Sequence, residues 1–418
     1  MAEVDEEGPT GSTPAPDAQA ADQPRRRLPG SPRWPAVTVL WRPAAIFLAS
    51  RVVTLVGALV ASTLASRVAD DLSTGRPWPR LPPTDFLILR ALGAWDGGWY
   101  VRIAQLGYPE SAGGPVPLPD FAFFPLYPTS VGAVSRVTGV SPTVIGVALS
   151  MLFGLSTAVL LWVLAQRLGG RDMADRAVAL FCFFPGSIVL SMAYSESMMI
   201  TFSLACLIAL LARRWWWAGA AAALATATRP NAVALCLCCA WAAGVAIHKR
   251  REWKSLVAPV LSVAGVGAYF AYLWARTGEP LLWFRVQQES WGERFDFGAG
   301  SWRRLRDTFD APFDPHHFRD VNALVATLGL LFVVVALWFL WRWRPPAVLT
   351  IFTLVVLGLA LTSQTLGMRP RFVMTAFPLF LALAAKLRGA PFQATVMTSA
   401  GLLGVFMILS VATTLATP

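Results

Sequence analysis

The chain has 418 residues, of which 56% are hydrophobic and only 14% are charged, and its formal net charge is +11. An ordinary soluble protein has about 25% charged residues, so this chain has too few to cover its own surface in water. Apolar stretches of about 17 to 25 residues, the length that crosses a bilayer, recur along the sequence. The composition therefore predicts an all-α polytopic membrane protein.

The positive net charge does not indicate a nucleic-acid partner, since no basic face alternates with stacking aromatic residues on a soluble module. Lysine and arginine instead accumulate in short connections between apolar segments, which is typical of the cytoplasmic side of membrane proteins. The five cysteines all lie in apolar segments and are expected to be small apolar filling residues rather than metal ligands or disulfides.

The N-terminal segment is rich in Pro, Gly, Ala, Asp and Glu and has no apolar periodicity. We expect residues 1–40 to be a disordered cytoplasmic tail and residues 44–418 to form a single integral membrane domain. That domain is expected to contain about 11 transmembrane helices, in a range of roughly 10 to 13. The apolar blocks lie at residues 44–65, 141–166, 174–193, 197–212, 216–228, 231–247, 256–275, 322–342, 346–362, 372–388 and 393–415.

Basic residues in the short connections assign the two sides of the membrane. When the connections that carry them are placed inside, two longer loops, at about 67–120 and 276–320, lie outside. Segment 121–139 is apolar enough to insert, but a full pass there would invert everything downstream, so we expect a re-entrant or interfacial helix. We therefore expect the protein to lie in the plasma (inner) membrane, with a cytoplasmic N-terminus and an extracytoplasmic active site.

The first external loop contains a carboxylate between aromatic residues. Asp96 lies in the sequence Ala-Trp-Asp-Gly-Gly-Trp-Tyr, next to Trp95, Trp99 and Tyr100. Partial desolvation raises the basicity of a carboxylate, which suits a general base that takes a proton from a hydroxyl. The three aromatic side chains could stack on a sugar or a lipid headgroup. The alternative is a solvated helix cap within an interfacial aromatic belt.

Further charged residues lie on the same predicted face. Arg229 interrupts two short apolar segments beside Pro230, the one clear helix break in the sequence, and a cation at such a break suits an anion. Arg369 and Arg371 lie between two spans and could bind a phosphate bidentately. Glu196 begins a span at a depth where ionisable residues usually face a partner or a cavity. The alternatives are arginines that snorkel to lipid headgroups and an interfacial helix cap.

The second external loop adds Gln287 and Trp291, which could form a lid or part of an acceptor site. The sequence has no Walker loop, Gly-x-Gly-x-x-Gly unit, serine elbow or His-Glu-x-x-His motif, which disfavours ATP-driven transport and nucleotide chemistry. One carboxylate base, several arginines and many aromatic residues suit the displacement of a lipid phosphate by a hydroxyl. We expect no metal site and no cofactor besides a lipid-linked donor, and leave a divalent metal requirement open.

In these same segments the sequence resembles the PIG-V-type mannosyltransferases, which are multi-pass glycosyltransferases of the GT-C superfamily. The matching segments lie in the expected order across residues 95–378, and the fifth of them is typical of bacterial members. They are WDGGWYVRIAQLGYP, FAFFPLYP, FPGSIVLSMAYSES, ATATRPNA, GEPLLWFRVQQESWG and RPRFVMTAFPLF.

The resemblance implies a GT-C-type glycosyltransferase fold, a polyprenyl-phosphate-mannose donor and an acceptor hydroxyl on a glycoconjugate. It also implies an essential aspartate in the first external loop, which corresponds to Asp96. Eukaryotic relatives often have a small polar residue and His where this chain has Gly97 and Gly98, and tend to have Ser in place of Pro230. These departures concern the acceptor, which we expect to be an envelope glycolipid or lipoglycan rather than a GPI precursor.

The expected reaction is an inverting transfer of mannose, with Asp96 as the base and Arg229, Arg369 and Arg371 at the departing phosphate. One alternative is a lipid or solute transporter or flippase, with Glu196 and Arg229 as its intramembrane charges. A transporter would more typically show an inverted repeat with paired broken helices. A GT-C enzyme for another lipid-linked sugar and a non-catalytic partner subunit are further alternatives.

Overall fold

The computed structural model describes residues 39–68, 86–109, 119–294, 296–300, 302–303, 306, 321–363 and 369–412. All of these residues belong to one unit, residues 34–418. They form helices and turns without a β-strand, in agreement with the predicted all-α class. Residues 1–38 of the predicted tail and parts of both predicted external loops lie outside the described residues.

The described part of the chain is a succession of α-helices joined by short connections, several of which are 3-10 turns. The α-helices are α1 (Trp41–Val68), α2 (Leu87–Leu92), α3 (Asp96–Leu106), α4 (Leu126–Thr138), α5 (Pro142–Gly169), α6 (Arg171–Cys182), α7 (Glu196–Leu211), α8 (Trp215–Thr226), α9 (Ala234–Arg250), α10 (Val257–Ser262), α11 (Ala264–Thr277), α12 (Leu282–Trp291), α14 (Val321–Trp343), α15 (Ala347–Leu361), α16 (Pro370–Thr375), α17 (Pro378–Lys386) and α18 (Gly389–Ala412). The 3-10 turns are η2 (Pro119–Ala122), η3 (Pro185–Leu190), η4 (Pro230–Val233) and η5 (Trp253–Leu256).

Several helices are long and apolar enough to cross a bilayer, so this is a multi-pass membrane protein. Among the described residues there are five, or six if the bent pair Trp253–Ser262 and Ala264–Thr277 is one span. The five are Trp41–Leu64, Pro142–Gly169, Pro230–Arg250, Leu324–Trp343 and Gly389–Ala412. The other predicted spans fold as shorter helices or as pairs of helical segments, and the total of about 11 passes stays a prediction.

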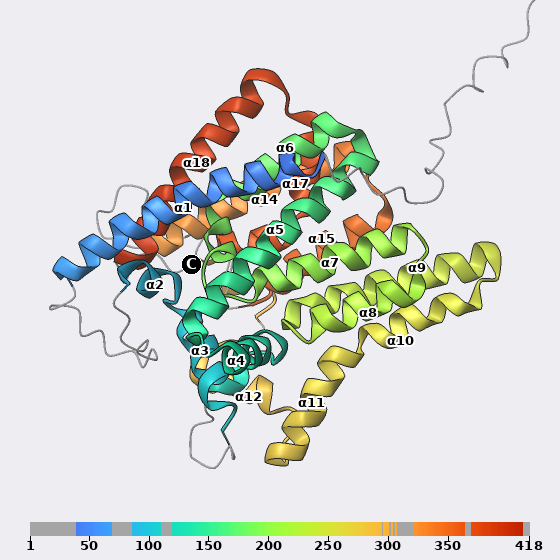
Figure 1. Cartoon of the computed structure of the whole chain (residues 1–418). Coiled ribbons are helices and arrows are strands. Elements are labelled where there is room, and N and C mark those ends of the chain that lie inside the picture. Colours follow the sequence, from blue (N-terminus) through green and yellow to red (C-terminus); the bar gives the residue numbers. More distant parts are fainter. Residues whose placement is uncertain are drawn as a thin grey trace, which may run out of the picture. The chain divides into compact units, whose positions relative to one another are not determined.

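The longest helices show why these segments fold as they do. α5 begins with Pro142, whose fixed φ and missing N–H suit the first position of a helix. It continues for 28 residues to Gly169 and is followed by Gly170, which has a φ of 85° that a side chain would make unfavourable. Its buried face packs against α1, α6 and α7, and Figure 1 shows α1 and α18 side by side along the same unit.

Segment 121–139 does not cross the membrane as one helix. It contains part of η2 and then α4, whose 13 residues are about 20 Å long at 1.5 Å per residue. The hydrocarbon core of a bilayer is about 30 Å thick. α4 instead packs against α3 and α5, and the expected interfacial or re-entrant position of this segment stays a prediction.

The two predicted external loops contain helices of their own. α2 and α3 lie in the first loop and α12 lies in the second, and α12 packs against η2. Apolar residues of these short helices are buried against their neighbours, so tertiary packing stabilises segments that look too polar and too short to be helical alone.

The expectation of a single helix break is wrong. The chain is also interrupted between α6 and α7, where η3 begins at Pro185, and between α16 and α17, where Pro378 starts a new helix. Proline cannot donate the hydrogen bond of a helix interior, and its ring clashes with the preceding turn, so each proline ends one segment and begins the next. Predicted spans 174–193 and 372–388 are therefore each made of two helical segments.

A buried arginine holds the first of these breaks in place. Arg51 of α1 is 1% exposed and donates hydrogen bonds to the main-chain oxygens of Ser187, at 2.6 Å, and Cys182, at 2.9 Å. It also donates to the hydroxyls of Ser187 and Ser191. The guanidinium thus satisfies carbonyls that a regular helix would have paired internally, and it fixes η3, which leads to the next segment of the site.

Candidate active site

Asp96 is the first residue of α3 and is held there by main-chain geometry. Trp95 precedes it with φ 58° and ψ −127°, a conformation that costs energy for a residue with a side chain. The indole Nε1 of Trp95 donates to the main-chain oxygen of Ser410 at 2.6 Å, which ties the start of α3 to α18. The Asp96 N–H donates to the Tyr194 hydroxyl at 3.1 Å, and the Asp96 side chain stays 14% exposed.

Arg371 of α16 contacts the Asp96 carboxylate. Its Nη1 lies 2.5 Å from Asp96 Oδ2 and 3.9 Å from Glu196 Oε1. The guanidinium also lies over the rings of Tyr194, at 5.6 Å, and Phe372, at 4.7 Å. These contacts surround the Arg371 side chain, which is 8% exposed.

The position of Arg371 depends on a close approach of two backbone segments. A Cβ on Gly186 of η3 would lie 2.4 Å from the main-chain carbon and oxygen of Pro370 and 2.8 Å from the Arg371 nitrogen. Only glycine leaves room for this contact, and η3 is also held by the hydrogen bond from Arg51 to the main-chain oxygen of Ser187.

Glu196 and Arg229 complete the cluster. Glu196 is the first residue of α7 and its side chain is completely buried, with Oε1 2.9 Å from Arg229 Nη1. The same Nη1 donates to the Ser195 hydroxyl at 3.1 Å, and Ser195 and Tyr100 share a hydrogen bond of 2.6 Å.

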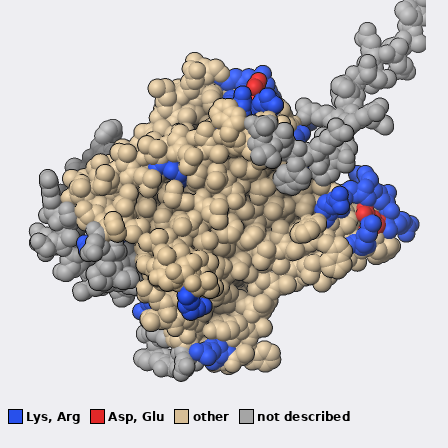
Figure 2. Space-filling model, in the orientation of Figure 1, with Lys and Arg blue, Asp and Glu red and all other residues tan. Residues whose placement is uncertain are grey.

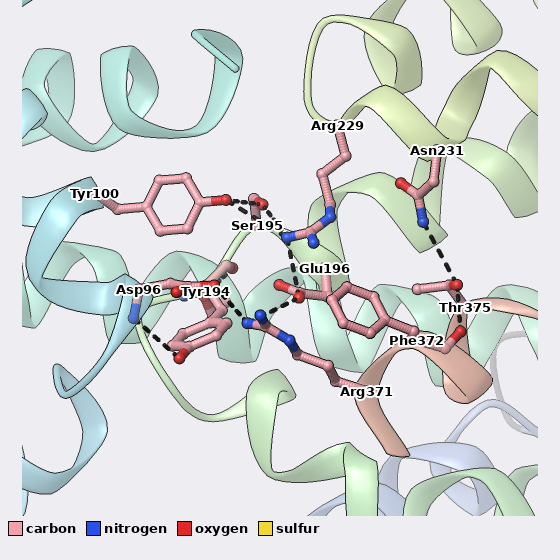
Figure 3. A network of polar contacts seen from close by, with 11 residues as sticks. Asp96, Tyr100, Tyr194, Ser195, Glu196, Arg229, Asn231, Arg371, Phe372 and Thr375 are labelled. Carbon is pink, nitrogen blue, oxygen red and sulfur yellow. Dashed lines mark hydrogen bonds and ion pairs between the residues drawn. The ribbon is translucent and has the colours of Figure 1, made fainter. Parts of the chain in front are cut away.

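Four charged side chains therefore alternate in sign, in the order Asp96, Arg371, Glu196 and Arg229 (Figure 3). They come from the start of α3, from α16, from the start of α7 and from the residue before η4. Their formal charges sum to zero.

Tyr100 supplies a neutral hydroxyl at the edge of the cluster. Burial raises the pKa of Tyr100 to about 12, and the positive charge of Arg229 opposes that increase. The hydroxyl therefore keeps its proton near neutral pH and acts as a hydrogen-bonding group rather than as a base.

The structure brings together Asp96, Glu196, Arg229 and Arg371, and places Tyr100 beside them. Arg369 lies two residues before Arg371, at the residue that precedes α16, and residues at i and i+2 do not share a helix face.

The remaining aromatic residues of the prediction pack against one another. Trp99 is 5% exposed and stacks on Phe123, with ring centroids 6.1 Å apart, while the Arg102 guanidinium lies 5.6 Å from the Trp99 ring. Trp291 of α12 meets Trp99 and Phe123 edge-on, at 6.4 and 6.0 Å. Gln287 lies on the same helix, one turn before Trp291. Trp99, Phe123 and Trp291 form an aromatic wall between α3 and α12, and Phe123 also contacts the ring of Tyr100.

Sequence reasoning missed Tyr194, Ser195 and Arg51 as residues of the site or of its support. Tyr194 and Ser195 precede Glu196 directly, but nothing in their local pattern indicates that they contact Asp96 and Arg229. Arg51 had a signal, since a single cation within a long apolar span usually has a specific partner. Among the described residues, no group of three or more His, Cys, Asp and Glu side chains could hold a metal ion.

Residues 85–275 match the model of a family described as mannosyltransferase (PIG-V). The resemblance to the PIG-V mannosyltransferase family is confirmed. The matched segment contains Asp96, Glu196 and Arg229, whereas Arg371 lies beyond it. That the chain is a bacterial-type member of this family stays a prediction.

Two curated relatives carry the name GPI mannosyltransferase 2. The protein of Drosophila pseudoobscura pseudoobscura is 32% identical over 131 residues, which cover 29% of this chain and 27% of the relative. That of Drosophila melanogaster is 32% identical over 126 residues, which cover 27% of this chain and 26% of the relative. The similarity thus spans about a quarter of the length of these relatives.

Proposed function

We propose that the protein is a membrane glycosyltransferase that moves mannose from a polyprenyl-phosphate-mannose donor to a hydroxyl of an envelope glycolipid or lipoglycan. The reaction takes place at the extracytoplasmic face of the plasma membrane. One observation carries the proposal: a segment that matches a mannosyltransferase model contains a partly exposed carboxylate, Asp96, in contact with an arginine cluster.

In the proposed step, Asp96 takes the proton of the acceptor hydroxyl as the oxygen attacks the anomeric carbon of mannose. The bond between that carbon and the phosphate oxygen breaks, and its electron pair leaves with the polyprenyl phosphate. Because attack comes from the face opposite the phosphate, the configuration inverts and a β-linked donor gives an α-mannoside.

Arg371 and Arg229 neutralise the departing phosphate, with Arg369 at the edge of the same region. Guanidinium groups suit this role because their donors match two phosphate oxygens at once. Arg371 must release Asp96 for the reaction, since a carboxylate in contact with a guanidinium is a weaker base. We assign the aromatic wall with Trp99 and Trp291, together with Trp95 and Gln287, to the binding of the sugar and the acceptor.

The test is mannose transfer by the purified full chain, from radiolabelled polyprenyl-phosphate mannose to a membrane lipid extract. Asp96→Asn keeps the shape of the side chain and removes the base, so kcat should fall by about 10²–10⁴-fold while the protein stays folded. Asp172→Asn, an exposed acid at the start of α6, is the matched control and should transfer normally.

Retained transfer by Asp96→Asn would show that this residue is not the base. If the wild-type chain transfers no mannose but moves labelled lipid across a vesicle bilayer, the transporter alternative would replace the proposal. Transfer of a different sugar would retain the class of reaction and change the donor.

A further inference from the structure

Both arginines assigned to the phosphate already have carboxylate partners. Arg371 contacts Asp96 at 2.5 Å, and Arg229 contacts Glu196 at 2.9 Å. Glu196 Oε1 also lies 3.9 Å from Arg371 Nη1, so a single carboxylate oxygen lies between the two guanidinium groups. A phosphate that binds these arginines must therefore compete with carboxylates for the same donors.

Glu196 has no access to a substrate. Its side chain is completely buried at the first turn of α7, and its Oε2 accepts no hydrogen bond from the part of the chain that the structure describes. Any effect of Glu196 on the reaction must therefore pass through the arginines, which makes it a positioning residue rather than a catalytic one.

We infer that Glu196 is an internal counterion that competes with the lipid phosphate for Arg229 and Arg371, so that the phosphate product can leave. This inference rests on the proposed function. In the site without substrate, the Glu196 carboxylate pairs with the arginines in place of the phosphate. It pairs with them again when the product departs.

The charges of donor and product explain why release needs such a residue. The phosphodiester of the donor carries one negative charge, whereas a phosphate monoester, the form in which the product leaves, carries about 1.5 to 2 at neutral pH. The product therefore binds two arginines more strongly than the donor does. A fixed buried anion beside the arginines opposes this stronger binding, because its repulsion is screened little by solvent.

A purely structural role for Glu196 predicts the opposite sign. If Glu196 only kept the arginines in place, its loss would weaken phosphate binding. The arginines have other contacts, however: Ser195 bonds to Arg229, while Asp96 and the ring of Tyr194 hold Arg371. We therefore expect them to stay in place without Glu196 and to bind phosphate more tightly.

The experiment measures binding of farnesyl phosphate, a short isoprenoid phosphate monoester, to the purified full chain in detergent. Glu196→Gln should bind it about tenfold more tightly than the wild type. Farnesol, which lacks the phosphate, should bind both proteins equally, and inorganic phosphate tests whether the effect needs the lipid chain. In mannose transfer, the same variant should lower both kcat and the KM for the donor, as expected when product release becomes slow.

Asp120→Asn is the matched control. Asp120 is also a buried carboxylate with an arginine partner, but that partner is Arg102, at 3.1 Å, which does not belong to the four-charge cluster. Its replacement should leave the affinity for farnesyl phosphate unchanged. A tighter complex with Asp120→Asn would mean that any lost negative charge has the same effect, which contradicts the specific role of Glu196.

Glu196→Asp keeps the charge and moves it away from Arg229 by about one carbon–carbon bond, so it should fold even if Glu196→Gln does not. It should bind farnesyl phosphate more tightly than the wild type, by a smaller factor than Glu196→Gln. Weaker or unchanged binding by the folded variants would overturn the inference, as would a wild-type chain that does not bind farnesyl phosphate. Because binding is measured without transfer, a failure here is separate from a failure of the proposed mannose transfer.

Discussion

Arg369 and Arg371 show how much a single position matters at the scale of the residue. The two arginines look equivalent in the sequence Gly-Met-Arg-Pro-Arg-Phe, where either could bind a phosphate. In the structure Arg371 is buried against Asp96, because α16 turns its second residue toward the starts of α3 and α7. The sequence suggested both arginines as candidates and did not distinguish the one that contacts Asp96.

We expect Arg371→Gln to reduce mannose transfer far more than Arg369→Gln. Loss of Arg371 removes a guanidinium in contact with Asp96 and should cost about 10²–10³-fold in kcat. The measurement is steady-state transfer at saturating acceptor, with Arg369→Gln as the control two residues away. Equal losses in both variants would contradict the assignment of Arg371 to the cluster.

Arg51 is the residue whose loss should most affect the stability of the site. Arg51→Met would leave the main-chain oxygens of Cys182 and Ser187 without this buried donor, at a cost of about 2–5 kcal/mol. Thermal unfolding in detergent should show a clearly lower midpoint than for Arg214→Met, in which an exposed arginine is lost. Arg51→Lys should lie between the two, because an ammonium cannot reproduce the fork of a guanidinium. An unchanged midpoint for Arg51→Met would refute this role.

At the scale of the element, apolar blocks of spanning length predicted the long helices, but the contacts between helical segments depend on small residues such as Gly186. Long apolar blocks such as α1, α5 and α18 followed directly from composition, since each is long enough to satisfy its own backbone in a membrane. The break between α6 and α7 was not predicted, because Pro185 and Gly186 are common in loops of any kind. Only the contact of η3 with α16 explains why a glycine lies at residue 186.

Gly186→Ala should therefore impair transfer without abolishing membrane insertion. The new Cβ would displace the backbone of Pro370 and Arg371, and a displacement of about 1 Å at a reacting group can cost about 10²-fold in rate. Gly97→Ala is the control beside Asp96, because its Cβ would lie 3.6 Å from the Ala193 oxygen, an ordinary contact. If transfer by Gly186→Ala equals that of Gly97→Ala, the close approach does not position Arg371.

At the scale of the whole molecule, charge and aromatic side chains are distributed unevenly. On the face shown in Figure 2, lysine and arginine form a few groups separated by uncharged surface, one of them over the ends of α9 and α10. Exposed tryptophans such as Trp216, Trp217 and Trp253 flank that group. Its basic residues, all exposed, are Arg213, Arg214, Lys249, Arg250, Arg251 and Lys254. This arrangement is typical of the ends of spanning helices at a membrane surface and supports a cytoplasmic assignment for these turns.

The assignment of sides can be tested by labelling with a membrane-impermeant maleimide. In a chain whose five native cysteines are replaced by alanine, Lys249→Cys should react only in inverted membrane vesicles and Gln288→Cys only in intact cells. Both positions are exposed, at the end of α9 and on α12. Labelling of both from the same side would contradict the predicted topology.

Composition, apolar length and charge asymmetry determined that this is an all-helical, multi-pass membrane protein. The reason is that a bilayer offers no hydrogen-bond partner to the backbone, so an apolar segment that crosses it must satisfy its own backbone groups as a helix. The sequence also predicted Asp96, Glu196, Arg229 and Arg371 as site residues, since charges beside apolar segments are costly and usually have a partner. Only the tertiary structure decided how they pair, because the partners lie on four segments that are far apart in the chain. The same packing decided that Glu196 is completely buried and lies against Arg229, since burial depends on the neighbouring segments rather than on the local sequence.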